Sequence, residues 1–183
     1  MIDEKIADLE KLSNHTVGLA AHTGVVDVRI AAKAKSESEA NAMIAEIESQ
    51  VRERLGSIVF GVDEDTLEEV VLNMVAKRGL TLTAIESGLD GLLARKIPHA
   101  ASLPNLTTDS LMQALRSAQA DSKADIALGV SVFTEERAAE MAMITAKGEK
   151  THHITYGGPP RSLPYWAMNL ALNWLRTTLE EID

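Results

Sequence analysis

The stretch TLTAIESGLDGLLARK, residues 81–96, decides the fold class. A short apolar run ends in Glu86 and Ser87, and a glycine-containing turn then leads into a second apolar segment. This order predicts a strand over 80–86, a tight turn and a helix over 90–97, which together form the strand–turn–helix unit of α/β proteins. Such junctions are where α/β folds place catalytic hydroxyl groups and bound phosphates.

Ser87 is the candidate nucleophile of this junction. Its hydroxyl would meet the backbone N–H groups and the positive dipole end of the following helix. Gly88 and Gly91 would let a ligand approach the backbone closely. The alternative is that Ser87 only caps the helix. A serine nucleophile also needs a base, and this turn supplies only the carboxylates of Glu86 and Asp90, which activate a serine poorly.

Lys96 and His99 are the candidate substitute bases for Ser87. Lys96 ends the predicted helix, and His99 follows in the irregular segment IPHAASLPNLTT, residues 97–108. A histidine in this segment could fold back toward Ser87, and the alternative is an ordinary surface histidine.

The rest of the carboxy-terminal half predicts further strands and helices. The expected elements are a helix over 108–121, a strand over 125–133, and two strands, Glu140–Ala146 and Thr151–Tyr156, joined by the turn KGEK. A last helix follows the chain-breaking GGPPRSLP, and its expected inner face carries Ala167, Leu170, Ala171, Trp174 and Leu175. Strand–helix units followed by a hairpin and a helix predict a mixed sheet flanked by helices.

The first sixty residues predict a separate small α+β unit. Its expected elements are a helix over Met1–Leu12, strands Thr16–Ala21 and Val25–Ala32, a long helix that starts at a Ser36–Glu39 capping box, and a short strand SIVFG over 57–61. This α-β-β-α-β order predicts one long helix packed on a small sheet. A second capping box, Asp65–Glu68, predicts the start of the next helix, which places a domain boundary near Gly61–Asp63.

The net charge of −9 and the absence of cysteine narrow the classes of function. Nucleic-acid binding requires clustered lysine and arginine, and no such cluster is present, so no nucleic-acid partner is predicted. Without cysteine there is no disulfide framework and no thiolate metal site. No apolar run approaches the roughly 20 residues that cross a bilayer, and the start MIDEKIADLEK is charged rather than signal-like. We therefore predict a cytoplasmic protein that makes no membrane contact.

His152 and His153 are neighbours on a predicted strand, so their side chains point to opposite faces and cannot hold one metal ion. Solvent is the expected environment of both. Neither a metal site nor a cofactor is predicted.

Several stretches resemble the competence/damage-inducible protein CinA family. TLEEVV (66–71), followed by RGLTLTAIESGLDGLLARKI (78–97), resembles the start of the family's carboxy-terminal domain, and SKADIALGVS (122–131), the hairpin and the last helix match the rest of it. The stretch from NHTVGLAAHTG to GSIVFG, residues 14–61, resembles the KH-type subdomain that precedes that domain. The resemblance implies a KH-type subdomain over 1–61 and a three-layer α/β domain over 62–183.

The resemblance also implies an activity. Active members of the family are nicotinamide-nucleotide amidohydrolases, which release ammonia from nicotinamide mononucleotide. Their strand-end motif reads Glu-Ser-Cys-Thr-Gly-Gly and supplies a hydroxyl nucleophile, which a later tyrosine and lysine assist. In this sequence three motif positions match and three differ: Glu86, Ser87 and Gly91 match, whereas Gly88, Leu89 and Asp90 stand in place of Cys, Thr and the first Gly.

Two other parts of the family's pocket also differ. Residues 97–108 stand where the family has a strand with the tyrosine and lysine, and VFTEER (132–137) stands where it has a Gly-Ile-Ala-Gly-Pro loop. We therefore expect a catalytically degenerate CinA-like protein that acts as a binding or structural homo-oligomer. One alternative is an active deamidase in which Ser87 works with Lys96 or His99. The other is a regulatory module that binds a pyridine nucleotide at residues 87–91.

Overall fold

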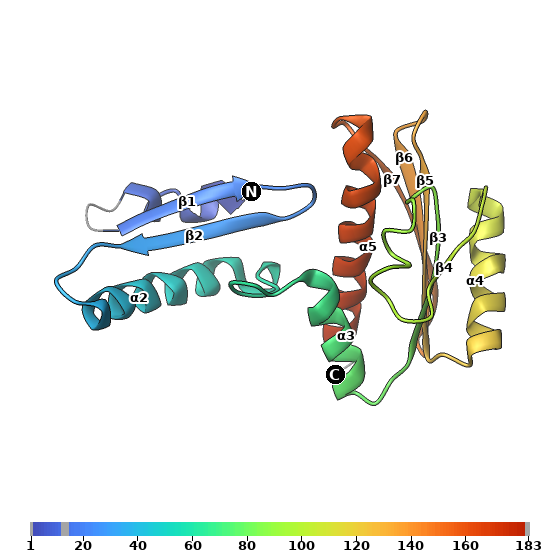
Figure 1. The fold of residues 1–183 in the computed structure, drawn as a ribbon, viewed down its shortest axis with the longest axis horizontal. Helices are drawn as coiled ribbons and strands as arrows, with labels where there is room; N and C mark the ends of the chain where they lie inside the picture. Colours follow the sequence, from blue (N-terminus) through green and yellow to red (C-terminus); the bar gives the residue numbers. More distant parts are fainter. Residues whose placement is uncertain (1, 12–14, 182–183) are drawn as a thin grey trace. The chain divides into compact units, whose positions relative to one another are not determined.

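The structure, a computed structural model, describes residues 2–11 and 15–181. The chain divides into two compact units, Met1–Phe60 and Gly61–Asp183. Figure 1 labels the strands and the longer helices of both units. The first unit is α+β and the second is α/β with a mixed sheet, which confirms the predicted fold class.

In the first unit a two-stranded antiparallel sheet packs on one long helix. β1 (His15–Ala21) pairs with β2 (Val26–Ala32) along its whole length, and α2 (Glu37–Leu55) follows. The short segments α1 (Ile2–Ile6) and η1 (Leu9–Lys11) precede the sheet, and η2 (Gly56–Ile58) follows α2. The buried core of this unit consists of Ile6, Leu9, Val17, Ile47, Val51 and Leu55.

Two sequence predictions for the first unit need correction, and one is confirmed in part. The predicted helix over Met1–Leu12 is two short segments, and Met1 and Leu12 lie outside the described residues. The predicted strand over 57–61 is wrong, because Gly56 has a φ of 55° and Val59 N donates to Gly56 O at 3.1 Å, so the chain turns here. The Ser36 half of the predicted capping box at α2 is confirmed, since Ser36 Oγ accepts from Glu39 N at 3.2 Å. The reciprocal half differs, because Glu39 Oε2 accepts from Lys35 N at 3.1 Å rather than from Ser36 N.

The second unit is built around a five-stranded sheet with the order β4-β3-β5-β6-β7. β3 (Leu82–Ser87) lies between two parallel neighbours, β4 (Ala101–Ser102) and β5 (Ile126–Phe133). β6 (Ala138–Thr145) and β7 (Gly148–Thr155) continue the sheet in antiparallel pairing. The turn between β6 and β7 is shorter than the predicted KGEK turn, because Thr145 already pairs with Gly148.

Helices cover both faces of this sheet (Figure 1). α4 (Thr108–Ser122) lies on one face, and α3 (Leu67–Lys77) and α5 (Leu163–Glu180) lie on the other. The short η3 (Pro160–Ser162) leads into α5. Beneath α4 the core consists of Ile85, Leu111, Leu115, Ala127, Ala142 and Ile144. Because helices cover both faces, β3, β5 and β6 are buried almost throughout, which explains their largely apolar sequences.

The start of α3 differs by one residue from the prediction. The capping box is Thr66–Glu69 rather than Asp65–Glu68, because Thr66 Oγ1 accepts from Glu69 N and Glu69 Oε2 accepts from Thr66 N, both at 3.4 Å. Asp65 instead turns back into the preceding loop, where its Oδ2 accepts from Val62 N at 2.9 Å.

The predicted helix over 90–97 is wrong, and this segment is a series of turns. Asp90 and Gly91 have left-handed φ values of 53° and 78°, which a right-handed helix does not contain. The backbone N–H groups of Leu93 and Ala94 donate to the Glu86 carboxylate instead of to helix carbonyls. Arg95 N and Ile97 N still donate to Gly91 O and Leu93 O four residues earlier, so the segment contains single turns but no regular helix.

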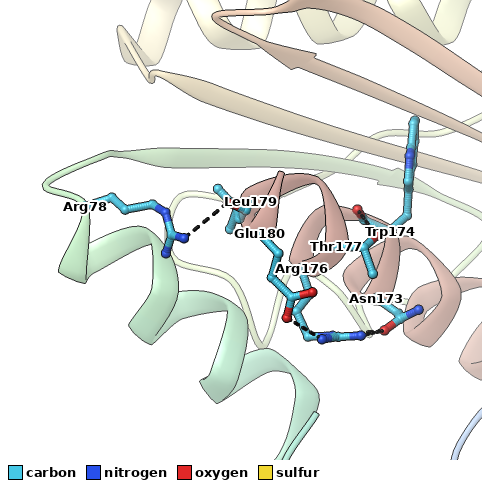
Figure 2. Close-up of polar contacts among 7 residues, drawn as sticks. All are labelled: Arg78, Asn173, Trp174, Arg176, Thr177, Leu179 and Glu180. Carbon is cyan, nitrogen blue, oxygen red and sulfur yellow. Dashed lines mark hydrogen bonds and ion pairs between the residues drawn. The ribbon is translucent and has the colours of Figure 1, made fainter. Parts of the chain in front are cut away.

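Arginine contacts hold α5 together and join it to the end of α3 (Figure 2). Arg78 Nη2, just after α3, donates to Leu179 O at 3.1 Å. Arg176 is only 2% exposed, and it donates to Glu180 Oε1 at 2.7 Å and to Asn173 Oδ1 at 2.9 Å. The Arg78 bond joins the end of α3 to α5, whereas the Arg176 bonds lie within α5. Both helices lie on the sheet face opposite α4 (Figure 1).

Asp125 joins the starts of β3 and β5, and its contribution to stability depends on pH. Thr81 N and Thr81 Oγ1 donate to Asp125 Oδ2 at 2.8 and 2.7 Å, and these bonds lower the pKa of Asp125 below its ordinary value of 3.8. Because the folded-state pKa is the lower one, the stabilisation is complete above the unfolded pKa and is lost as the pH falls through the folded pKa.

We therefore expect Asp125→Asn to flatten the acid side of the stability curve, measured by urea denaturation at a series of pH values. Asp121→Asn is the matched control, because Asp121 is exposed and its carboxylate makes no hydrogen bond within the described residues. Equal acid slopes for wild type and Asp125→Asn would contradict the prediction.

Candidate functional site

The carboxyl ends of β3 and β5 lie side by side at one edge of the sheet. Ser87, the last residue of β3, is the register partner of Ser131 on β5. Both serines are buried, with exposed fractions of 5% and 1%. The carboxyl ends of parallel strands are where open α/β sheets bind ligands. The candidate site is therefore at this edge.

Residues 102–106 cross this edge and hydrogen-bond to both serines. Ser87 Oγ accepts from Leu106 N at 3.1 Å, and Ser131 Oγ donates to Leu106 O at 2.6 Å. Leu103 N donates to Glu86 O at 2.8 Å. Among the residues that the structure describes, Leu106 N is the hydrogen-bond partner of the Ser87 hydroxyl. The hydroxyl predicted as a nucleophile is thus held by a backbone amide and not by a base.

An open cleft of about 440 Å³ lies next to Ser87. This volume is within the range of small-molecule sites in proteins. The residues that line it come from the end of β3, from the crossing segment and from the end of β5: Ser87, Gly88, Asp90, Ser102, Leu103, Pro104, Asn105, Leu106, Val132 and Phe133. Asp90 is the single charged residue in this lining.

Gly88 brings the turn after β3 close to the backbone of β5. Its φ is +72°, and a Cβ atom added here would lie 2.5 Å from Val132 O. Only glycine fits both the left-handed conformation and this close approach. Gly88 therefore shapes the cleft wall, and its predicted contact with a ligand stays a prediction.

Glu86 is fully buried and does not line the cleft. Its Oε2 accepts from Leu93 N at 2.7 Å and from Ala94 N at 3.2 Å, whereas its Oε1 has no hydrogen-bond partner in the described part of the chain. Since these bonds hold the turns after β3, Glu86 acts on the cleft by fixing the segment that carries Asp90.

The structure keeps both candidate bases away from Ser87. The Lys96 amine forms an ion pair with the Glu68 carboxylate on α3. His99 lies at the opposite end of β3, because its carbonyl accepts from Thr83 Oγ1 at 3.3 Å, and Thr83 precedes Ser87 by four strand residues, about 13 Å. Neither side chain forms a hydrogen bond with the serine hydroxyl in this conformation.

Gly91 and Arg95 lie beside the turn but outside the cleft lining. Arg95 Nη1 donates to the backbone oxygen of Asp90 at 2.8 Å and occupies the space where a side chain at Gly91 would lie. The Asp90 carboxylate has no hydrogen-bond or ion-pair partner among the described residues. Its charge is therefore available at the mouth of the cleft.

Sequence reasoning missed a polar row that continues across the sheet from Ser131. Ser131 is opposite Glu140 on β6, and Glu140 is opposite His153 on β7. Glu140 Oε1 lies 2.6 Å from His153 Nδ1 and accepts from Thr108 Oγ1 at 3.2 Å. The strand register that brings these side chains together cannot be read from one sequence.

His152 and His153 point to opposite faces of β7, as predicted, but solvent is not their only environment. His153 pairs with Glu140, and the His152 ring makes an edge contact with Trp174 at 4.5 Å between centroids. The described residues contain no cluster of three or more His, Asp or Glu side chains that could hold a metal ion. None of their helices is long and apolar enough to cross a membrane.

Comparison with known proteins gives consistent relatives for both units. Residues 1–61 match the family model described as the damage-inducible protein CinA KH domain. A CinA-like protein of Kosmotoga olearia is 36% identical over 155 residues, which cover 82% of this chain and 38% of the relative. A putative competence-damage inducible protein of Caldanaerobacter subterraneus is 41% identical over 108 residues, 57% of this chain and 26% of the relative. The chain thus spans between a quarter and two fifths of the length of these relatives.

Solved structures match about two thirds of the chain in fold. A crystal structure of a CinA superfamily protein from Enterobacter cloacae has a TM-score of 0.53 and 14% identity, and the match covers 66% of this chain and 96% of that one. A competence/damage inducible protein from Agrobacterium tumefaciens has a TM-score of 0.51 and 16% identity over 66% of this chain and 99% of that one. At this level of identity the likeness is one of fold.

Proposed function

Because this chain belongs to the CinA family, we propose that it is a member that has kept the family fold and binds a small ligand, without hydrolysing an amide. The observation that carries this proposal is the hydrogen bonding of the Ser87 hydroxyl group, to which no base among the described residues is bonded. Its hydroxyl oxygen accepts a hydrogen bond from Leu106 N, and the Lys96 amine pairs with Glu68. The backbone oxygen of His99 accepts from Thr83 Oγ1, which places this residue at the other end of β3.

Chemistry supports a binding role over an acyl-transfer role. A serine hydroxyl becomes a nucleophile when a base takes its proton, and the developing oxyanion needs hydrogen-bond donors. The cleft lining offers no lysine, arginine or histidine, and its one charge is the Asp90 carboxylate. A negative charge at this position opposes both an oxyanion and a bound phosphate.

The alternative function is amide hydrolysis with Ser87 as nucleophile. It would require Lys96 to leave Glu68, or His99 to move from the other end of β3. Loss of a base or nucleophile typically costs several powers of ten in rate.

Ammonia release from nicotinamide mononucleotide separates the two functions. We expect wild type and Ser87→Ala to release equal amounts of ammonia, indistinguishable from a protein-free blank. Turnover of about one per second by wild type, abolished in Ser87→Ala, would contradict the proposal and establish the alternative.

The resemblance to the CinA family predicts a pyridine nucleotide as the ligand, and this remains a prediction. Self-association of the chain is a second, separate prediction. The cationic nicotinamide ring suits the charge of Asp90, whereas the phosphate would meet no cationic side chain in the cleft lining. A ligand that binds the folded chain raises its melting temperature by mass action, so a thermal shift in the presence of the nucleotide reports binding without turnover.

A further inference from the structure

We propose that the cleft beside Ser87 selects small organic cations that carry an apolar or aromatic group, and that it discriminates against anions. This inference rests on the proposed function, because it treats the strand-end cleft as a binding site. It adds the chemical class of the ligand and identifies Asp90 and Phe133 as the residues that set it.

The charge of the cleft comes from Asp90 alone. Of the ten lining residues, nine are uncharged and the tenth is this aspartate. Its carboxylate makes no ion pair within the described residues, so a bound cation would not have to displace a partner. Attraction between opposite charges at an exposed position is modest but real, and the same geometry repels a carboxylate or a phosphate.

The Arg95 side chain contacts the backbone at Asp90. Its orientation does not cancel the preference of the cleft for cations over anions. Its Nη1 donates to the Asp90 backbone oxygen at 2.8 Å, and the guanidinium lies against Gly91 outside the cleft lining. The guanidinium thus neutralises part of the long-range field without occupying the carboxylate. Asp90 lines the cleft that an anion would enter, and Arg95 does not.

The walls of the cleft suit the apolar part of such a ligand. Phe133, the last residue of β5, is half-buried and lines the cleft together with Val132, Leu103 and Leu106. An aromatic face attracts cations by its quadrupole, and it also packs against flat apolar groups. A carboxylate together with an aromatic ring in one cleft is the combination that recognises ammonium and related organic cations.

Three probes that share one benzene ring test the charge preference. Benzylammonium is a cation, benzyl alcohol is neutral and benzoate is an anion. Their affinities for the full chain are measured by titration at low ionic strength, with backbone amide shifts in the NMR spectrum to locate the site. We expect benzylammonium to bind about five times more tightly than benzyl alcohol, and benzoate to bind more weakly than either. The amides of Gly88, Asp90 and Leu106 should shift.

Three variants assign the effect to residues. Asp90→Asn is expected to weaken benzylammonium binding about fivefold and to leave benzyl alcohol unchanged, because only the cation senses the carboxylate. Phe133→Leu keeps an apolar wall and removes the aromatic face, so it should weaken benzylammonium about threefold. Arg95→Gln is the matched control: it should leave benzylammonium binding unchanged or strengthen it.

Benzoate binding as tightly as benzylammonium would overturn the inference, as would an Asp90→Asn variant with unchanged cation affinity or amide shifts confined to other surfaces. The result of this binding test does not depend on whether the protein releases ammonia from nicotinamide mononucleotide. An active amidase that prefers benzylammonium would refute the proposed function alone, whereas an inactive chain without the charge preference would refute this inference alone.

Discussion

Gly88→Ala is expected to lower the free energy of unfolding by about 2–5 kcal/mol. The substitution forces an L-residue to a φ of +72° and places its Cβ 2.5 Å from Val132 O, which is backbone and cannot rotate away. The left-handed conformation costs about 1–2 kcal/mol, and overpacking costs a further 1–3 kcal/mol. Urea denaturation of the purified chain measures the change.

Gly79→Ala separates the two causes. Gly79 has a similar φ of +65°, but no atom lies within 4 Å of an added Cβ. This control should therefore show only the conformational cost of about 1–2 kcal/mol. If the two variants lost equal stability, the close approach of the turn to β5 would not contribute, and the cleft wall would be looser than described.

Glu86→Ala is expected to be as damaging, with a loss of about 3–5 kcal/mol. The variant removes the carboxylate that accepts from Leu93 N and Ala94 N, so two backbone donors under the turn lose their partner and a cavity forms. Each buried donor without a partner costs about 1–3 kcal/mol. Because these bonds fix the segment that carries Asp90, the variant should also lose the preference for benzylammonium.

Glu86→Gln is the control for this second prediction. Glutamine keeps a side-chain oxygen that can accept from the same two amides, and it removes the negative charge from a fully buried position. We expect its stability to stay within about 1 kcal/mol of wild type. If Glu86→Ala were as stable as Glu86→Gln, the turns after β3 would not need the carboxylate for their stability, and the prediction would be wrong.

Local patterns predicted the elements that hydrophobic spacing alone determines. The long helix after Ser36, the buried strands β3 and β5, the helix over 108–121 and the last helix all follow from apolar periodicity and capping residues, and the structure contains each of them. Two predicted elements failed, the strand over 57–61 and the helix over 90–97. In the segment 90–97, two backbone amides donate to the buried Glu86 carboxylate of the preceding strand. The spacing of apolar residues does not encode such a contact.

The site was predicted less completely, because it depends on contacts between distant segments. Ser87 and Gly88 could be placed at the end of β3 from the strand–turn pattern. That Leu106 would bond to Ser87, and that Phe133 would line the same cleft, depends on the register of β3 against β5 and on the path of 102–106. One sequence contains no periodic signal for either.

The order of the strands has a consequence for how the chain folds. β5, β6 and β7 are joined by the short connections 134–137 and 146–147, so this meander can form from local contacts. Thr81 and Asp125, which join β3 to β5, are 44 residues apart. Closing the longer loop costs about 2 kcal/mol more in chain entropy than closing a connection of a few residues. We therefore expect the meander to form first and the edge that bears the cleft to assemble later, when β3 docks on β5.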